Sequence, residues 1–579
     1  MILQALYEYY QRKTDDPDSG IAPEGFEWKE IPFVIVIDSD GNFVSLEDTR
    51  EGDGKKKRAK RFLVPAAEKK TVGIKANLLW DNIEYALGAN PRGRNDIDKR
   101  KRAFVKRLVE TFTVEPSVSL IMPLVSFLQN DTISKITAKV ADKELWNELY
   151  KNNFNVLFRV TGSKDTSLCE TLKPYINKQY STDTSICLVS GLRAPIARLH
   201  ASLKGIRGAQ SAGANLVSFN LPAFESYGKT QNYNAPISEA AAFAYTTALN
   251  ILLSRDSKNK VQVGDASTVF WSQKQNIFED TFASFFAMPP KDDPDIDVRA
   301  VKALYKGLFT GNTCSDSQTS FYVLGLAPNA ARISVRFWDK GTVEKFAEKI
   351  RQHYDDLEII RSPKDTGRYA LFWILSAIAQ ENKVDNIPPN LAGQIALAVI
   401  TGAPYPATMF HQAIRRIRAT QAVTRVQAGI LKAYLNRFYR IHPTKEKEIT
   451  VALDTANNNP GYRLGRLFAV LEKIQEEANP SLNATIRDRF YGAASSSPVT
   501  VFPQLLKLKN HHLAKLENVG RKVNFERMLT EIFDGIGSDM PSNLAMEDQS
   551  RFAIGYYHQR QALFSSSSNN ESQKERGSL

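Results

Sequence analysis

The stretch PFVIVIDSDGNFVSLED, Pro32 to Asp48, decides the fold of the N-terminal part of this chain. Two runs rich in β-branched and aromatic residues flank the pair Asp40–Gly41, which is typical of a tight turn between strands. The run FNVLFRV, residues 154–160, has the same composition and predicts a further strand. We therefore expect residues 1–160 to form a basic N-terminal domain of mixed α/β character.

The sequence after residue 450 predicts helices. The segment NNNPGYRLGRLFAVLEKIQEEANP begins with Asn459 and Pro460 in cap and first-turn positions, and its apolar residues recur at three-to-four spacing. Three later segments repeat this design, so residues 451–564 are expected to form a helical bundle. The tail 565–579 is too polar to fold alone and is expected to be disordered. With a central α/β and helical portion, residues 161–450, the predicted fold class is α+β.

Length and composition indicate a globular, soluble protein. The 579 residues, 42% of them hydrophobic, are enough for roughly three or four domains. No run approaches the ~18 apolar residues of a membrane span, and the first twenty residues carry charges where a signal peptide is apolar. Cys169, Cys187 and Cys314 lie too far apart for a disulfide framework or a zinc ribbon. We expect a cytoplasmic protein without membrane association.

Positive charge is concentrated in one tenth of the chain. The net charge is +13, and residues 55–107 alone hold seventeen Lys/Arg against five Asp/Glu. The motifs GKKKRAKRFLVP and DIDKRKRAFVKR carry most of these cations. A solvated loop or a nuclear-localisation signal would have the same composition. The uneven placement of the charge favours a site for a polyanion, with nucleic acid preferred.

A second basic feature is the segment His411–Arg440, which has seven Lys/Arg and no Asp/Glu. Its apolar residues recur at helical spacing. Arg418, Arg425 and Lys432 are seven residues apart and are expected to lie on one stripe of a helix. Such a stripe would either follow phosphates or pair with an acidic protein surface.

A glycine-rich stretch, SLKGIRGAQSAGANLVSFN, covers residues 202–220. Gly208 and Gly213 have the spacing of a phosphate-binding loop, but Ala214 and Asn215 stand where its lysine and hydroxyl would be. Nucleotide hydrolysis is therefore not expected, although glycines still let backbone N–H groups approach an anion. The following segment ESYGKTQNYNAPIS adds neutral groups that suit base edges and sugar–phosphate contacts. Two ordinary polar turns would have the same composition.

The candidate contact residues in these two stretches are Lys204, Arg207, Gly208, Gln210, Ser211, Asn215, Lys229, Gln231, Asn232 and Asn234.

The sequence contains no clear catalytic or metal motif. KDDPDIDVRAVK, residues 291–302, has four Asp, but it is typical of a loop that caps a helix, and no second acidic element matches it. His511 and His512 are adjacent on a predicted helix and point to different sides, and the other histidines are isolated. We expect no enzymatic activity, metal or cofactor. The alternatives are a metal-dependent nuclease that uses Asp293 and Asp295, and a free-standing RNA-binding protein.

Several segments together resemble one known family. They are ARLHASLKGIRGAQSAGANLVSFNLPAFESYGKTQNYNAP, DASTVFW, LGLAPNAARISVRFW, PPNLAGQIALAVITGAPYP and GYRLGRLFAVLEKIQEEANPSLNATIRDRFYGAASSSPVTVFPQLL. In order and spacing the chain resembles the large subunit of the type I-C (Dvulg subtype) CRISPR Cascade complex, nearly to the polar tail. The resemblance implies a non-catalytic subunit of a crRNA-guided antiviral complex. Such a subunit recognises the protospacer-adjacent motif in duplex DNA, helps open the target and recruits a helicase–nuclease.

The resemblance also implies partners and roles. The partners are crRNA, double-stranded target DNA, the backbone and handle-binding Cascade subunits, the helicase–nuclease, and a small subunit made from an internal start in the same gene. Met409 or a codon near Val451 would provide that start, and residues 451–564 would resemble the small subunit. The glycine-rich stretch would supply close backbone contact with DNA, and the 418–432 stripe would follow a separated strand or dock a subunit.

For the N-terminal region, the residues expected to grip duplex phosphates are Lys55, Lys56, Lys57, Arg58, Lys60, Arg61, Lys69, Lys70, Lys75, Arg92 and Arg94. The residues expected to contact base edges are Thr71, Asn77 and Asn82.

Overall fold

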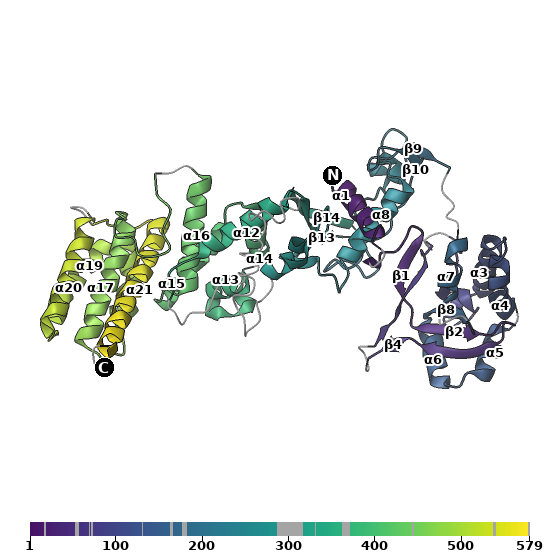
Figure 1. Cartoon of the computed structure of the whole chain (residues 1–579), viewed down its shortest axis with the longest axis horizontal. Coiled ribbons are helices and arrows are strands. Elements are labelled where there is room, and N and C mark those ends of the chain that lie inside the picture. Colours follow the sequence, from purple (N-terminus) through teal and green to yellow (C-terminus); the bar gives the residue numbers. More distant parts are fainter. Residues whose placement is uncertain are drawn as a thin grey trace. The chain divides into compact units, whose positions relative to one another are not determined.

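The structure of the chain is a computed structural model. It describes residues 1–16, 19–52, 57–68, 70, 73–129, 131–162, 166–176, 182–286, 317–330, 332–361, 371–388, 390–442, 445–536 and 540–576. The fold class is α+β, as predicted (Figure 1). The chain divides into two compact units. Unit 1 comprises Met1–Leu203 and Asn215–Ile251, and unit 2 comprises Lys204–Ala214 and Leu252–Leu579. The domain boundaries expected after residues 160 and 450 lie inside these units.

Unit 1 is built on a four-stranded mixed sheet of order β3-β2-β8-β7. β2 (Phe33–Ile37) pairs antiparallel with β3 (Phe43–Asp48), which confirms the predicted hairpin, and parallel with β8 (Asn155–Val160). β7 (Trp80–Asn82) is antiparallel to β8. All five residues of β2 are buried, which explains why its sequence is a continuous apolar run.

The turn between β2 and β3 is fixed by its own side chains. Asp38 accepts hydrogen bonds from the backbone N–H groups of Asp40 and Asn42, at 3.0 and 2.7 Å. Gly41 has a φ of +81°, and a Cβ at this position would lie 2.6 Å from the carbonyl oxygen of Pro123. Only glycine fits there, because both the conformation and the space exclude a side chain.

Helices pack on this sheet. Phe104 of α3 and Phe127 of α4 both contact Phe158 of β8, with ring centroids 6.3 and 6.4 Å apart, so α3 and α4 lie on the same face. The helices of unit 1 are α1 (Ile2–Thr14), α2 (Ile83–Ala86), α3 (Ile97–Thr111), α4 (Ser117–Gln129), α5 (Thr132–Lys139), α6 (Lys143–Asn152), α7 (Leu168–Thr171) and α8 (Glu239–Leu252).

Three short antiparallel ribbons complete unit 1. They pair β1 (Phe26–Glu30) with β6 (Arg61–Pro65), β4 (Arg50–Glu51) with β5 (Arg58–Ala59), and β9 (Thr184–Ile186) with β10 (Arg193–Pro195). The first two ribbons carry the basic motif that follows residue 56.

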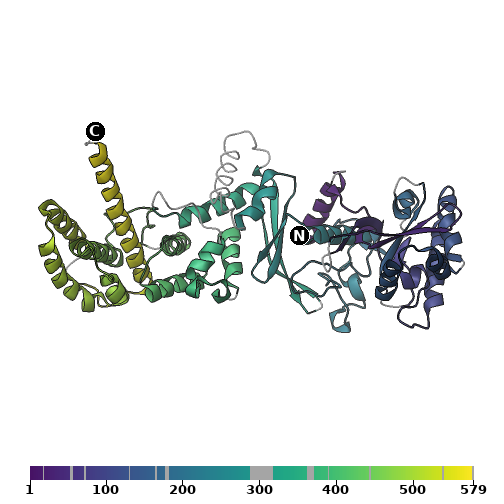
Figure 2. The ribbon, with the colours of Figure 1, turned by 90° about the horizontal axis from the view of Figure 1, so that it is seen from below.

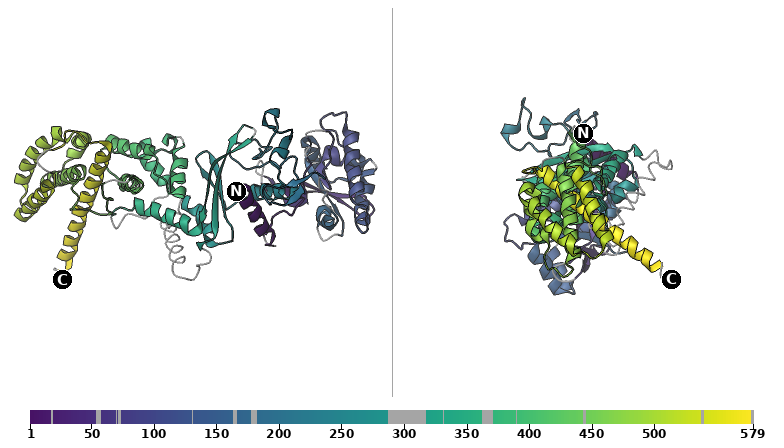
Figure 3. Two further views of the ribbon diagram at one scale, coloured as in Figure 1. Left: turned by 90° about the horizontal axis from the view of Figure 1, so that it is seen from above. Right: turned by 90° about the vertical axis from the view of Figure 1, so that its left-hand side faces the viewer.

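Unit 2 begins with an antiparallel sheet in sequence order (Figure 3). Its strands are β11 (Lys260–Val263), β12 (Ala266–Ser272), β13 (Ser320–Asn329) and β14 (Arg332–Thr342). All seven residues of β12 are buried. Among the described residues, α9 (Ile277–Thr281) lies between β12 and β13, and the helices that follow the sheet are α12 (Val343–Leu357), α13 (Leu371–Ile378), α14 (Leu391–Thr401), α15 (Ala407–Thr420) and α16 (Arg425–Ile441).

The predicted helical bundle is present. It contains α17 (Pro460–Ala478), α18 (Ile486–Ser496), α19 (Pro498–Lys515), α20 (Val519–Asp534) and α21 (Met546–Arg576), which lie beside one another in Figure 2. The Asn459 side chain accepts a hydrogen bond from the N–H of Tyr462, and Pro460 occupies the first turn, as predicted. The backbone of α21 is helical to Arg576, beyond the point where the polar tail begins. That the tail is disordered stays a prediction.

The bundle shares its core with the helices before it. A single hydrophobic cluster runs from the sheet of unit 2 through α12–α16 to α17–α21. Arg551 of α21 donates a hydrogen bond to the hydroxyl of Tyr439 on α16, and the hydroxyl of Tyr557 donates to the carbonyl of Ile360. The bundle therefore packs continuously with the central helices, although the sequence pattern predicts a separate bundle after residue 450.

Candidate nucleic-acid interface

The basic segment of unit 1 exposes its cations on strands and turns. Lys57, Arg58, Lys60 and Arg61 are all exposed, on or beside β5 and β6. In the same ribbon Val64 is fully buried. The ribbon thus turns its apolar side inward and keeps its charged side chains in water. Lys55 and Lys56 lie outside the described residues.

The acids of this segment are turned inward. The carboxylate of Asp81 is 1% exposed and lies 2.5 Å from the ammonium of Lys70. The carboxylate of Glu84 is 2% exposed and faces the guanidinium groups of Arg92, Arg94 and Arg100 at 3.8, 3.3 and 3.4 Å. One buried negative charge is thus surrounded by three arginines, two of which, Arg92 and Arg94, are exposed.

Because most of these acids are buried or half-buried, the exposed part of residues 57–107 has a larger excess of cations over acids than the residue counts of the sequence indicate. Among the described residues of 57–107, Asp98 is the only exposed acid, whereas Glu68 and Asp96 are half-buried. The exposed cations of the same range are Lys57, Arg58, Lys60, Arg61, Lys75, Arg92, Arg94, Lys99, Arg102 and Lys106. We call these ten residues the basic face of unit 1, a name for the whole set, which is distributed over the β5–β6 segment, the turns before α3 and α3 itself.

Sequence reasoning missed three members of the basic face. Lys99, Arg102 and Lys106 are spaced three and four residues apart on α3, so they lie on one side of the helix. The motif DIDKRKRAFVKR contains this signal, because cations at this spacing on a predicted helix predict a charged stripe.

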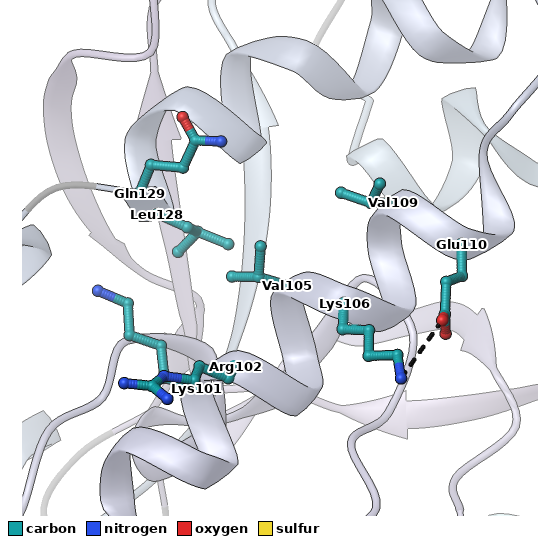
Figure 4. Close-up of a pocket in the computed structure, with 8 residues that line it drawn as sticks. All are labelled: Lys101, Arg102, Val105, Lys106, Val109, Glu110, Leu128 and Gln129. Atoms are coloured by element: carbon teal, nitrogen blue, oxygen red, sulfur yellow. Dashed lines mark ion pairs between the residues drawn. The ribbon is translucent and has the colours of Figure 1, made fainter.

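A shallow groove of about 600 Å³ lies between α3 and α4 beside this stripe (Figure 4). Its floor includes Val105 and Val109, and Glu110 pairs with Lys106 at 3.5 Å on the rim. Lys101, Arg102 and Lys106 also line the groove, so three of its lining residues are cations and Glu110 is the one acid among them.

Lys70 and the two amides predicted to read bases have other partners in the protein. Lys70 neutralises Asp81, and burial lowers the pKa of Lys70. Asn77 is 4% exposed, and its side-chain oxygen accepts a hydrogen bond from the N–H of Glu68 at 2.9 Å. Asn82 caps α2 by accepting from the N–H groups of Glu84 and Tyr85.

These contacts give Asn77 and Lys70 structural roles. Asn77 is buried and its acceptor is used within the protein, and the charge of Lys70 compensates a buried carboxylate. Their contacts with bases and phosphates stay predictions. Asn82 is half-buried and has a structural role as a cap, so only its amide N–H₂ remains to face a ligand. Lys69 and Thr71 lie outside the described residues.

The part of the glycine-rich stretch that belongs to unit 2, Lys204–Ala214, is partly a packing element. Gly205 has a φ of +83°, and a Cβ there would lie 2.3 Å from the carbonyl oxygen of Leu253. The backbone N–H of Arg207 donates to Ser267 at 3.0 Å, which anchors the loop to β12. By contrast, Gly208 has only a single side-chain neighbour at 3.4 Å. The exposed candidates of this stretch are Lys204, Arg207, Gly208, Gln210 and Ser211.

The candidate amides between Asn215 and Asn234 mostly form hydrogen bonds within unit 1. Asn215 accepts a hydrogen bond from Ser202 at 3.1 Å, and Asn232 is 1% exposed. Asn234 accepts from the N–H of Ser226 and donates to two backbone carbonyls. Asn232 is buried and the bonds of Asn234 use both ends of its amide, so both side chains have structural roles, and their contact with DNA stays a prediction.

In the same segment, Gln231 accepts a hydrogen bond from Arg198 at 3.2 Å and is half-buried, whereas Lys229 is exposed. Of the four candidates from Lys229 to Asn234, Lys229 is therefore the one whose side chain is exposed.

The predicted stripe of Arg418, Arg425 and Lys432 is wrong. The segment forms two helices, because Gln421 adopts a left-handed φ of +52° and Thr424 begins α16 with a capping box. Lys432 is 3% exposed and donates to the carbonyls of Asp355 and Asp356 at 3.2 and 3.0 Å.

The other two members of that stripe differ in exposure. Arg418 is exposed on α15, whereas Arg425 is half-buried at the start of α16. Further along α16, Arg437 and Arg440 both pair with the buried Asp356. Three of the seven cations of the segment, Lys432, Arg437 and Arg440, therefore stabilise the packing of α16 on α12.

Within the described ranges, no group of three or more His, Cys, Asp or Glu side chains is placed to hold a metal ion. Asp293, Asp295 and the rest of the 291–302 segment lie outside those ranges. None of the described helices combines the length and the apolar character needed to cross a bilayer.

The fold and the exposed cations define a class: an α+β protein whose unit 1 exposes the ten cations of the basic face. The comparison with known families gives a more specific result. The family model described as CRISPR-associated protein (Cas_Csd1) matches residues 6–564, and the chain belongs to this family. It is therefore a CRISPR-associated protein, which confirms the coarser part of the resemblance. No curated protein matches the chain significantly.

Proposed function

We propose that this chain is the non-catalytic large subunit of a type I-C crRNA-guided complex. In this role it recognises the protospacer-adjacent motif in duplex DNA, helps open the target and recruits the helicase–nuclease that cuts it. Its partners are the crRNA, the target duplex, the backbone and handle-binding subunits, and a small subunit from the same gene. The guide supplies most of the sequence specificity, so the polypeptide needs to read only a short motif and to hold backbone.

The observation that carries this proposal is the separation of charge in unit 1. The acids of residues 57–107 are mostly buried or half-buried, whereas ten cations are exposed on strands, turns and α3. A stability role does not require this arrangement, because exposed like charges repel one another. A surface of this kind attracts phosphates and releases their counterions on binding.

The glycine-rich stretch and the bundle have separate roles in this proposal. Arg207, Gln210 and Ser211 lie on an anchored, exposed loop, which suits close contact with a sugar–phosphate backbone. The bundle α17–α21 would line a separated strand, both within this chain and as the small subunit.

The packing of α21 bears on where the small subunit begins. A product that starts at Met409 keeps Tyr439, the partner of Arg551 on α21. A product that starts near Val451 loses Tyr439 and retains Asp548 as the partner of Arg551. The packing therefore favours a start at Met409.

The salt dependence of duplex binding tests the proposal. With 6–10 phosphates neutralised, the affinity of the chain for a duplex should fall by about 10³–10⁵ between 50 and 200 mM salt. The triple variant Lys99→Ala, Arg102→Ala, Lys106→Ala should lower the slope of log affinity against log salt by about 2 to 3, because each contact contributes about 0.9.

A charge-matched triple variant provides the control. Lys139, Lys143 and Lys151 are exposed cations of the same unit outside the basic face. Their replacement by Ala removes the same charge and should leave the slope nearly unchanged. Equal slopes for the two triple variants would show that binding follows net charge and not the basic face.

A further inference from the structure

A tight hairpin turn projects from unit 1 at Tyr227. Ser226 and Lys229 form an antiparallel bridge, and the N–H of Lys229 donates to the carbonyl of Ser226 at 3.0 Å. The two central residues, Tyr227 and Gly228, have φ values of +55° and +69°. Positive φ at both central positions is the pattern of a type I′ turn, in which the first of them is usually Asn, Asp or Gly.

Tyr227 is an unusual residue for this position. A bulky aromatic side chain with positive φ is disfavoured by contact with its own backbone, so it persists only where the surroundings or a function retain it. The side chain of Tyr227 is 100% exposed, so no packing within unit 1 offsets this cost. A residue that strains the backbone and buries nothing in its own unit is a candidate for contact with a ligand.

Hydrogen bonds from residues that follow the turn stabilise its conformation. Asn234 accepts a hydrogen bond from the N–H of Ser226 and donates to the carbonyls of Lys229 and Gln231, at 2.8 to 3.0 Å. The N–H of Gln231 donates to the carboxylate of Glu225 at 3.2 Å. The tip is thus pre-organised, which lowers the entropy that a ligand must remove on binding.

The residues around the ring are polar, and one charge of each sign lies two residues from it. Glu225 precedes Tyr227, and its carboxylate accepts the N–H of Gln231. Lys229 lies two residues after Tyr227 and is exposed. An exposed aromatic ring beside a cation matches the pairing of base stacking with phosphate contact that single-stranded nucleic acid uses.

We propose that Tyr227 stacks on a nucleobase that is not paired in a duplex, while Lys229 contacts a neighbouring phosphate. This inference rests on the proposed function, because it assumes that the chain meets separated strands or guide RNA. A protein contact is less favoured, because aromatic anchors of protein interfaces lie within apolar patches. The immediate neighbours of Tyr227 in the turn, by contrast, are Ser226, Gly228 and Lys229.

Fluorescence of 2-aminopurine in the assembled, guide-loaded complex tests the proposal, because stacking on an aromatic ring quenches this base. Three samples carry the probe in the target strand beside the motif, in the displaced strand, or in the 5′ handle of the guide. They distinguish a DNA base from an RNA base. The wild type should quench the probe in at least one sample.

Two variants distinguish an effect of the aromatic ring from an effect on the conformation of the turn. Tyr227→Phe keeps the ring and should keep the quenching. Tyr227→Asn removes the ring but suits a positive φ, so the turn should stay folded while quenching is lost. The affinity of the complex for the stacked strand should then fall by about 5- to 150-fold, as for loss of one stacked base.

Each remaining outcome has a defined meaning. Equal quenching by the wild type and Tyr227→Asn in every sample would overturn the proposal. The proposal would also be overturned if Tyr227→Asn released the chain from the complex while the fluorescence of the probe stayed as in the wild type. Tyr227 would then be a contact with another protein subunit. Motif discrimination, measured on the same wild-type complex, reports separately on the proposed function. If discrimination is absent while quenching still depends on Tyr227, the proposed function fails and the stacking inference stands.

Discussion

The ammonium group of Lys70 lies 2.5 and 2.7 Å from the two carboxylate oxygens of Asp81, and it also lies 3.8 Å from the ring centre of Tyr85. Asp81 in turn accepts the backbone N–H groups of Asn77 and Asn82. Lys70 is therefore the counterion of a buried acid that holds the entry to β7 and α2. Its place in a basic sequence does not make it a DNA contact.

Replacement of Lys70 by Ala should destabilise the protein. Asp81 would keep its backbone bonds but lose its counterion, and we expect a loss of about 2–3 kcal/mol in unfolding free energy. This is less than for a fully buried pair, because the Lys70 side chain is 27% exposed. Urea or thermal unfolding measures the change.

Lys75 offers the matched control, since it is exposed and only five residues away. Lys75→Ala should change stability by less than about 0.5 kcal/mol and should weaken binding to all duplexes alike. If Lys70→Ala were as stable as Lys75→Ala, the assigned role of the Lys70–Asp81 pair would be wrong.

Close contact between α17 and α21 requires glycine. A Cβ on Gly465 would lie 2.0 Å from the carbonyl oxygen of Phe552, which belongs to the backbone of the opposite helix and cannot move aside. We expect Gly465→Ala to destabilise the bundle by about 3 kcal/mol through overpacking.

Gly492 of α18 gives the opposite expectation, because a Cβ there would have no neighbour within 4 Å. Gly492→Ala should stabilise the protein by about 0.5–1 kcal/mol, since alanine loses less backbone entropy in a helix. Thermal unfolding of both variants checks the pair, and a similar shift for the two would contradict the helix contact.

Two buried histidines should make unit 2 sensitive to mild acid. Burial lowers the pKa of His353 to about 3 and that of His558 to about 4, from an ordinary value of 6.5. Below pH 6.5 the unfolded chain binds protons that the folded chain does not bind. Stability is therefore present above pH 6.5 and is lost as the pH falls toward 4, by about 1.4 kcal/mol per pH unit for each histidine.

Urea unfolding between pH 7 and pH 5.5 measures this loss. His558→Gln should remove roughly half of the pH dependence, whereas His511→Gln, at an exposed position on α19, should leave it unchanged. A stability that is flat over this pH range would show that the two histidines are not buried as neutral groups.

Local signals in the sequence were enough to predict several elements. The β2–β3 hairpin follows from Asp40–Gly41 between apolar runs, and the start of α17 follows from Asn459 and Pro460. These predictions depend on residues close in the chain, where turn and cap chemistry act directly.

Side-chain partners could not be predicted in the same way. Lys70 and Lys75 look alike in sequence, yet only the return of the chain through β7 brings Asp81 to Lys70. Lys432 has the heptad spacing of a surface stripe, but α16 packs that side against the carbonyls at the end of α12. The pairing of charges depends on tertiary contacts, which residue spacing along one helix does not contain.

The most direct measurement of the central claim compares guide-loaded complexes assembled with and without this chain. Each is titrated with duplex targets that differ only in the motif beside the guide-matched sequence. We predict that the complete complex binds the duplex with the correct motif more tightly, and that the complex without the chain binds both duplexes alike. Equal discrimination by the two complexes would contradict the account, because motif recognition would then belong to another subunit.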